Sequence, residues 1–186
     1  LESDGLNVVV EPVWSAEMEG MVLEQEPPPD TTVHASDTVT LTVSGGLDVP
    51  IPLEVNFSDT IMLERAELDQ VVFQPGDEVS FVLYWRALRE VSRHYRVFVH
   101  LQGSGGPSTT PVAYGDADPV MSSTLWTPGE GSDVIVKDAH EILVPVGLSA
   151  GRYQLRVGLY IRESGQRLAV LDPGLAEVEM DSILIA

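Results

Sequence analysis

The sequence predicts a mainly β protein in two parts, a small β module linked to a larger antiparallel β-sandwich. Apolar residues recur at every second position in several separate segments, as expected for strands that bury one face. Clusters of Pro, Gly and Asp separate these segments and mark turns. No segment of useful length has the spacing of an amphipathic helix.

The first part is predicted to hold three strands, at residues 6–14, 21–26 and 38–43. In the last of them Val39, Leu41 and Val43 alternate with threonines. The run 27–30, Pro-Pro-Pro-Asp, cannot supply a strand ladder and marks a turn. Residues 1–6 resemble the last turn of a helix with its glycine stop, so we expect this chain to be a fragment of a longer protein.

A Gly- and Pro-containing segment divides the two parts, which gives a module at 1–46, a linker at 47–53 and a second domain at 54–186. The second domain shows longer period-2 runs, each with one wholly apolar face. Their predicted bounds are 61–68, 79–86, 95–102, 135–144, 153–162 and 176–185. Several strands joined by turns predict a β-sandwich of immunoglobulin-like type.

Composition narrows the possible partners. The formal net charge is −19, and residues 1–50 hold ten acids without a single Lys or Arg. Such a field repels phosphate, so we expect no nucleic-acid binding. There is no Cys for a disulfide, a thiol nucleophile or a Cys-ligated zinc. No apolar run approaches the roughly 18 residues of a membrane span. Membrane attachment is therefore expected only through an anchor outside this fragment.

The order of signals in the first part, a Gly-led strand at 20–26, the Pro turn and a Thr/Val strand closing on Ser44-Gly45-Gly46, resembles the C-terminal part of a PASTA module over about residues 1–46. PASTA modules occur outside the cell on penicillin-binding proteins and bacterial Ser/Thr kinases. The resemblance implies an extracytoplasmic, bacterial cell-surface location and a non-catalytic role in binding or spacing at the cell wall, with peptidoglycan or another wall glycan as partner.

The second part contains, in order, the segments 74–77, 83–87, 95–101, 116–119, 126–130 and 151–160. This set is similar to an uncharacterised β-sandwich domain common in surface proteins of filamentous green bacteria, over about residues 54–186. The resemblance implies a fold and a location, but no activity.

Two sets of side chains are candidate binding residues. Asp116 and Asp118, with Asp133 and Asp138 nearby in sequence, are expected in or beside loops and could offer oxygens to Ca²⁺, although turn formation is the favoured interpretation and no cofactor is expected. The aromatic rings of Trp14, Tyr114 and Trp126 are expected near strand ends and could stack on a sugar. For Trp126, packing against the sandwich is favoured, and Trp85 is expected in the core.

Other polar groups suggest no catalytic centre. His34, His94, His100 and His140 lack metal-ligand spacing, and His100 is expected on an outer face. Arginines 86, 96, 156 and 162 lie on polar strand faces and could form either cross-strand ion pairs or a carboxylate-binding strip. We expect no enzyme. The alternatives to a wall-associated module are a carbohydrate-binding sandwich attached to a larger envelope enzyme and the ectodomain of a Ser/Thr kinase.

Overall fold

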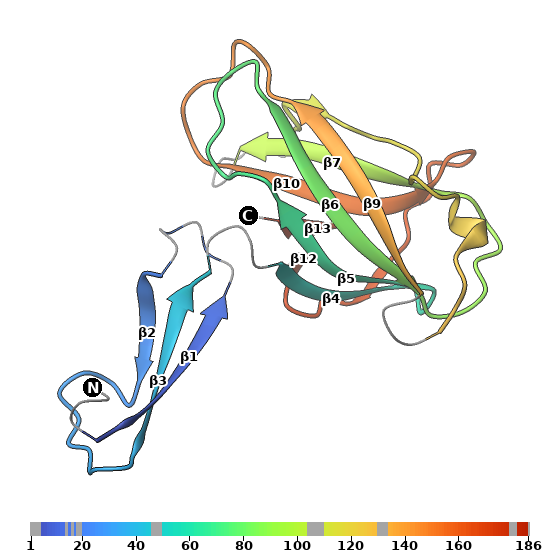
Figure 1. Cartoon of the computed structure of the whole chain (residues 1–186). Helices are drawn as coiled ribbons and strands as arrows, with labels where there is room; N and C mark the ends of the chain where they lie inside the picture. Colours follow the sequence, from blue (N-terminus) through green and yellow to red (C-terminus); the bar gives the residue numbers. More distant parts are fainter. Residues whose placement is uncertain are drawn as a thin grey trace. The chain divides into compact units, whose positions relative to one another are not determined.

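A computed structural model describes residues 5–13, 15, 17, 20–45, 50–103, 110–129, 134–178 and 182–185. The chain divides into two compact units, Leu1–Ile51 and Pro52–Ala186 (Figure 1). Regular structure among the described residues is almost entirely strand, and a short 3-10 turn, η3, covers Ser123–Leu125. In the same part of the chain, no helical segment has both the length and the hydropathy that crossing a bilayer requires.

The first unit is a three-stranded sheet, and its three predicted strands are confirmed. The strands are β1 (Asn7–Val13), β2 (Val22–Glu26) and β3 (Thr38–Ser44), in the order β1-β3-β2. β3 pairs in parallel with β1 and antiparallel with β2. Because a parallel connection needs a long crossover, the 24 residues from 14 to 37 pass through β2 and the Pro turn before reaching β3.

The two faces of this small sheet differ in polarity. The pairing places Val10 beside Leu41 and Val22 beside Val43, so these residues share one apolar face. Val39 of β3 is buried on that face, yet Val10 and Val22 remain 56% and 52% exposed. The opposite face carries threonines of β3 together with acids of β1 and β2, namely Glu11, Glu24 and Glu26.

The second unit is a β-sandwich of two five-stranded sheets (Figure 1). Sheet I has the order β11-β4-β5-β6-β9, with strands Val170–Asp172, Ile51–Phe57, Ile61–Leu68, Glu78–Ala87 and Ile135–Leu143. Sheet II has the order β12-β13-β10-β7-β8, with strands Glu177–Val178, Ile183–Ile185, Tyr153–Ile161, Tyr95–Gly103 and Ala113–Tyr114. The immunoglobulin-like arrangement of these strands stays a prediction.

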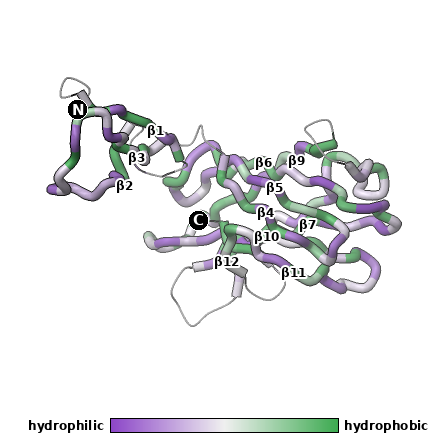
Figure 2. Tube along the Cα trace, turned by 90° about the horizontal axis from the view of Figure 1, so that it is seen from below, coloured by the Kyte–Doolittle hydropathy of each residue, from purple (hydrophilic) through white to green (hydrophobic). Residues whose placement is uncertain are grey.

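The core lies between the sheets, where the predicted alternation places apolar side chains. In β6 the side chains of Val79, Phe81, Leu83 and Trp85 are buried, and Trp85 is fully inaccessible to solvent. Sheet II contributes every second residue of β7 and β10, and apolar residues follow the strands of both sheets (Figure 2). Burial of these faces stabilises the unit by roughly 1.5–3 kcal/mol for each large apolar side chain removed from water.

Two sequence expectations about elements are corrected. Residues 51–53, assigned to the linker, begin strand β4, in which Leu53, Val55 and Phe57 are buried. The neighbouring strand β11 pairs only with Asn56 and Phe57, so Pro52 lies near a sheet edge, where proline is tolerated. Residues 176–185, predicted as one strand, contain the antiparallel pair β12 and β13. The predicted helix end at 1–6 lies mostly outside the described residues.

The outer face of sheet II is less solvated than the alternation predicts. Phe98 of β7 and Arg156 of β10 are each 2% exposed, although both point away from the core. The guanidinium of Arg167 lies over the Phe98 ring, 4.4 Å from its centroid, and Gly158 stands opposite Phe98 in the pairing. The Arg167 side chain thus covers the Phe98 ring at the position where the opposite strand has a glycine and no side chain. Buried groups therefore occur on both faces of β7 and β10.

Candidate functional site

A cluster of aromatic and ionisable side chains lies on the outer face of sheet II, centred on His100. The pairing sets Tyr114 of β8 next to His100, and the Tyr114 ring meets the imidazole edge-on at a centroid distance of 4.8 Å. The Phe98 ring also contacts the imidazole, at a centroid distance of 5.1 Å. His100 lies on the outer face, as expected, but its side chain is only 13% exposed because neighbouring rings cover it.

Asp116 holds this cluster at the β8 edge. Its Oδ1 lies 3.2 Å from His100 Nε2 and accepts a hydrogen bond from the Val99 amide at 3.3 Å. Burial raises the pKa of the Asp116 carboxyl. However, the contacts with His100, with Val99 N–H and with Tyr160 together outweigh it, so the pKa lies below its ordinary value. Asp116 is therefore a carboxylate that the fold stabilises in its charged form.

Tyr160 of β10 adjoins this carboxylate on the same face. Burial raises the pKa of the Tyr160 phenol, the nearby charge of Asp116 raises it further, and Arg96 and Arg162 act in the opposite direction. The phenol stays protonated and able to donate. Asp116, Tyr160 and Arg96 thus form one electrostatically connected group.

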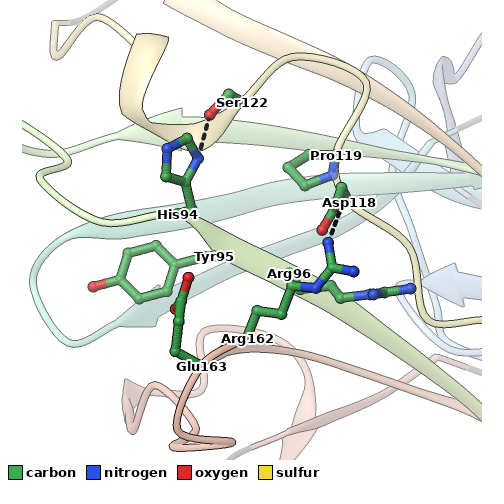
Figure 3. A pocket seen from close by; sticks show the side chains of 8 residues that line it. All are labelled: His94, Tyr95, Arg96, Asp118, Pro119, Ser122, Arg162 and Glu163. Carbon is green, nitrogen blue, oxygen red and sulfur yellow. Dashed lines mark hydrogen bonds and ion pairs between the residues drawn. The ribbon is translucent and has the colours of Figure 1, made fainter.

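A pocket of about 280 Å³, here called the end pocket, opens beside this cluster at the end of sheet II where β7 begins and β10 finishes. Its lining residues are His94, Tyr95, Arg96, Asp118, Pro119, Ser122, Arg162 and Glu163. Figure 3 shows the Arg162 guanidinium at Asp118, the Arg96 side chain extending past Arg162, and Tyr95 and Glu163 on the opposite side. Three distant segments of the chain meet here.

Hydrogen bonds fix parts of this pocket. Arg162 Nη1 donates to Asp118 Oδ2 at 3.2 Å, between two side chains that are each 62% exposed. Ser122 Oγ lies 2.7 Å from His94 Nδ1 on the far wall. Arg96 Nη2 donates to the backbone oxygen of Asp116 at 2.8 Å.

Of the three aromatic candidates, the structure describes Trp126 and Tyr114, which differ in exposure. Trp14 lies outside the described residues. Trp126 is 3% exposed, stacks on Trp85 at a centroid distance of 6.2 Å and donates its indole N–H to the Met121 carbonyl oxygen at 2.8 Å. Its ring is consequently not available for sugar stacking. Tyr114 is 63% exposed and presents the free side of its ring to solvent.

The candidate Ca²⁺ ligands are already engaged with cationic or donor groups. Asp116 contacts His100 and Asp118 contacts Arg162, while Asp133 lies outside the described residues. Across the residues described, no group of three or more His, Cys, Asp or Glu is arranged to hold a metal ion. Nothing in this geometry adds support to a calcium site.

Asp138 is expected in or beside a loop, and this expectation is wrong. It lies in the middle of β9, where Val136, Asp138, His140 and Ile142 all point inward, and it is fully buried. Its Oδ2 lies 2.7 Å from His140 Nε2 and accepts the Trp85 indole N–H at 3.1 Å, and its Oδ1 accepts the Val120 amide at 2.8 Å. The inward phase of both polar residues was visible in the strand pattern of 135–144.

The four arginines considered for a carboxylate-binding strip or for cross-strand ion pairs do not share one sheet. Arg86 belongs to β6 in sheet I, where it pairs with Glu64 of β5. Arg96 and Arg156 lie on adjacent strands of sheet II, and Arg162 follows the end of β10. Sequence alternation placed these residues on polar faces but could not assign them to a sheet.

Comparison with known proteins finds a family match for the first unit. Residues 1–45 match the model of the PASTA domain, which confirms that resemblance, whereas the resemblance of residues 54–186 stays a prediction. No curated protein matches the chain. A solved structure of the entire extracellular region of the Ser/Thr kinase PrkC from Staphylococcus aureus is similar at 12% identity, over 91% of this chain and 43% of that one. The TM-score is 0.23, which does not establish a shared fold, and the chain spans less than half of that region.

Proposed function

We propose that this chain is a non-catalytic, extracytoplasmic module that binds or spaces at the bacterial cell wall through its first unit. The observation that carries this proposal is the PASTA match over residues 1–45, on a segment that folds as the sheet β1-β3-β2. The proposed location rests on the same match, because modules resembling this one occur on the outer side of the membrane.

The charge of the first unit restricts what it can bind. Residues 1–50 carry ten acids and neither Lys nor Arg, so an anionic wall polymer would be repelled. The groups that fit are uncharged glycan and the amino groups of stem peptides. The apolar face that exposes Val10 and Val22 offers contact with the nonpolar side of a sugar or peptide.

A wall-sedimentation assay tests binding against spacing. The full chain is mixed with purified peptidoglycan at low and at moderate salt, and the fraction that sediments is measured. Binding predicts saturable sedimentation that V10Q and V22Q weaken, because both remove exposed apolar surface from one face. V9Q changes the opposite face of the same unit, and V72Q changes an exposed valine of the second unit, so these two are matched controls.

The outcomes separate the versions of the proposal. A protein that stays wholly in the supernatant at both salt concentrations would contradict binding and leave spacing as the role. Chromatography of the supernatant measures soluble wall fragments. Their release during incubation would contradict the non-catalytic assignment.

Carbohydrate binding by the sandwich is the second candidate, and the exposure of Tyr114 favours it. On a glycan array, Y114A should abolish any binding that the sandwich confers, because the ring is the exposed stacking surface. Binding that survives Y114A would remove this candidate. The kinase-ectodomain alternative is tested by the coding sequence upstream of Leu1, where that hypothesis requires a membrane span and a kinase domain.

A further inference from the structure

Arg96 is a half-buried cation that makes no ion pair with the described residues. Its Nη2 donates to a backbone oxygen, its Nε is buried without a hydrogen-bond partner, and no described carboxylate lies within ion-pair distance. Arg162 and Arg86, in contrast, each have a carboxylate partner. The protein has 29 acids for 10 Lys and Arg, so a missing counter-ion here is not a consequence of scarce acids.

This arrangement is costly unless another group completes it. A guanidinium that leaves water loses hydration, and a buried N–H without an acceptor loses a further hydrogen bond. Such unsatisfied groups in folded proteins commonly mark a bound ion, a water or a functional site. Arg96 lines the end pocket, so an anion in this pocket lies near the charge of its guanidinium, whereas the buried Nε–H gains an acceptor only if the side chain moves.

The other lining groups define what kind of acceptor fits. Arg162 adds a second guanidinium, whose charge Asp118 balances, and Glu163 offers a carboxylate that can accept hydrogen bonds from a ligand. Tyr95 and Pro119 provide flat and apolar surface. At about 280 Å³ the pocket has room for a single sugar ring or a dipeptide end, and not for a long polymer.

We propose that the end pocket binds a small carboxylate that also carries hydrogen-bond donors, with Arg96 as its counter-ion and Glu163 accepting from its hydroxyl or N–H groups. A monoanion fits better than a dianionic phosphate, because Asp118 and Glu163 line the same pocket and the whole protein is strongly acidic. The carboxylate can come from an acidic sugar or from the free C-terminal end of a peptide.

This site lies in the second unit and goes beyond the wall association proposed for the first. The two are experimentally separable. Wall sedimentation reports on residues of β1 and β2, whereas the end pocket is probed with small soluble ligands, so failure of one proposal leaves the other standing.

The test is a titration of the full chain labelled with ¹⁵N, with the arginine Nε–H signals observed by NMR. Sodium glucuronate is compared with methyl glucoside, and N-acetyl-alanyl-alanine with its C-terminal amide. We expect saturable shifts of the Arg96 Nε–H signal with at least one carboxylate and none with the neutral counterparts. The two pairs distinguish a sugar from a peptide source, and inorganic phosphate serves as a third probe.

Variants connect the shifts to the pocket. R96M keeps the aliphatic stem and removes the charge, and it should weaken carboxylate binding about tenfold or more, since it deletes charge-assisted hydrogen bonds. R162Q should weaken binding less, because Asp118 already balances that charge. The control R152Q makes the same charge change at an exposed arginine at the opposite end of β10 and should bind as the parent does.

Circular dichroism shows whether R96M remains folded, and R162Q provides a second measure if it does not. Equal shifts from glucuronate and methyl glucoside, no shift from either carboxylate, or tighter binding of phosphate than of both carboxylates would each overturn the proposal. So would loss of binding in R152Q equal to that in R162Q.

Discussion

Removing the Asp138 carboxylate should destabilise the second unit more than removing any exposed acid. In D138A the Trp85 indole N–H and the His140 imidazole lose their buried partner, and both side chains are almost fully inaccessible to solvent. Each buried polar group left unsatisfied costs about 1–3 kcal/mol, which gives about 2–6 kcal/mol for the two. The Val120 amide also loses its acceptor, but Val120 is 72% exposed and water can replace the carboxylate there.

This loss is large compared with the roughly 5–15 kcal/mol that holds a typical domain folded. The assay is urea unfolding followed by tryptophan fluorescence in a W14F background, so that the signal comes from Trp85 and Trp126 of the second unit. Far-UV circular dichroism provides a second probe. D138N should lose less than D138A, because the amide keeps one oxygen acceptor.

D118A is the matched control. Asp118 is 62% exposed and its ion pair with Arg162 lies at the surface, so its removal should cost no more than about 1 kcal/mol. If D138A proves as stable as D118A, the three hydrogen bonds of Asp138 do not stabilise the core. The argument that loss of buried hydrogen-bond partners destabilises this unit is then refuted.

Three further predictions use the same unfolding assay. W126A should cost about 3–5 kcal/mol, since it empties the space against Trp85, and a loss below about 1 kcal/mol would contradict this packing role. G115A should cost about 1–3 kcal/mol because a Cβ there would lie 2.8 Å from the Glu141 carbonyl oxygen, and an unchanged midpoint would contradict it. Asp116 has a lowered pKa, so its contribution is present above the pKa of the unfolded chain and is lost as pH falls through the folded value. The free energy of unfolding of D116N should therefore fall less steeply than that of the parent below about pH 4. A pH profile identical to that of the parent would count against this.

Strand existence followed from the sequence wherever alternation was long and uninterrupted. β6, β7 and β10 were predicted within one residue of their observed ends, and Trp85 was correctly placed in the core. The same pattern was present in 51–57, but the prolines at 50 and 52 concealed β4, because proline indicates a linker when the position of the sheet edge is unknown.

The candidate site was predictable only in pieces. Tyr114 and Asp116 were singled out for their side-chain chemistry, and the structure places both against His100. Arg96 was identified as a polar-face residue, without any sign that it would lack a counter-ion. Asp138 was misplaced because an acid is rare in a sandwich core, and a local pattern does not reveal the donors that make its burial tolerable.

The sequence by itself determined the β class, the inward phase of each long strand and the PASTA likeness of residues 1–45, since these depend on local alternation and local order of residues. Only the tertiary structure decided which strands are neighbours. That choice separates Arg86 from Arg96, brings Val120 to Asp138 and gathers residues 94–96, 118–122 and 162–163 around one pocket. The physical reason is that alternation acts within one strand, whereas partners for buried charges are supplied by segments far apart in the chain.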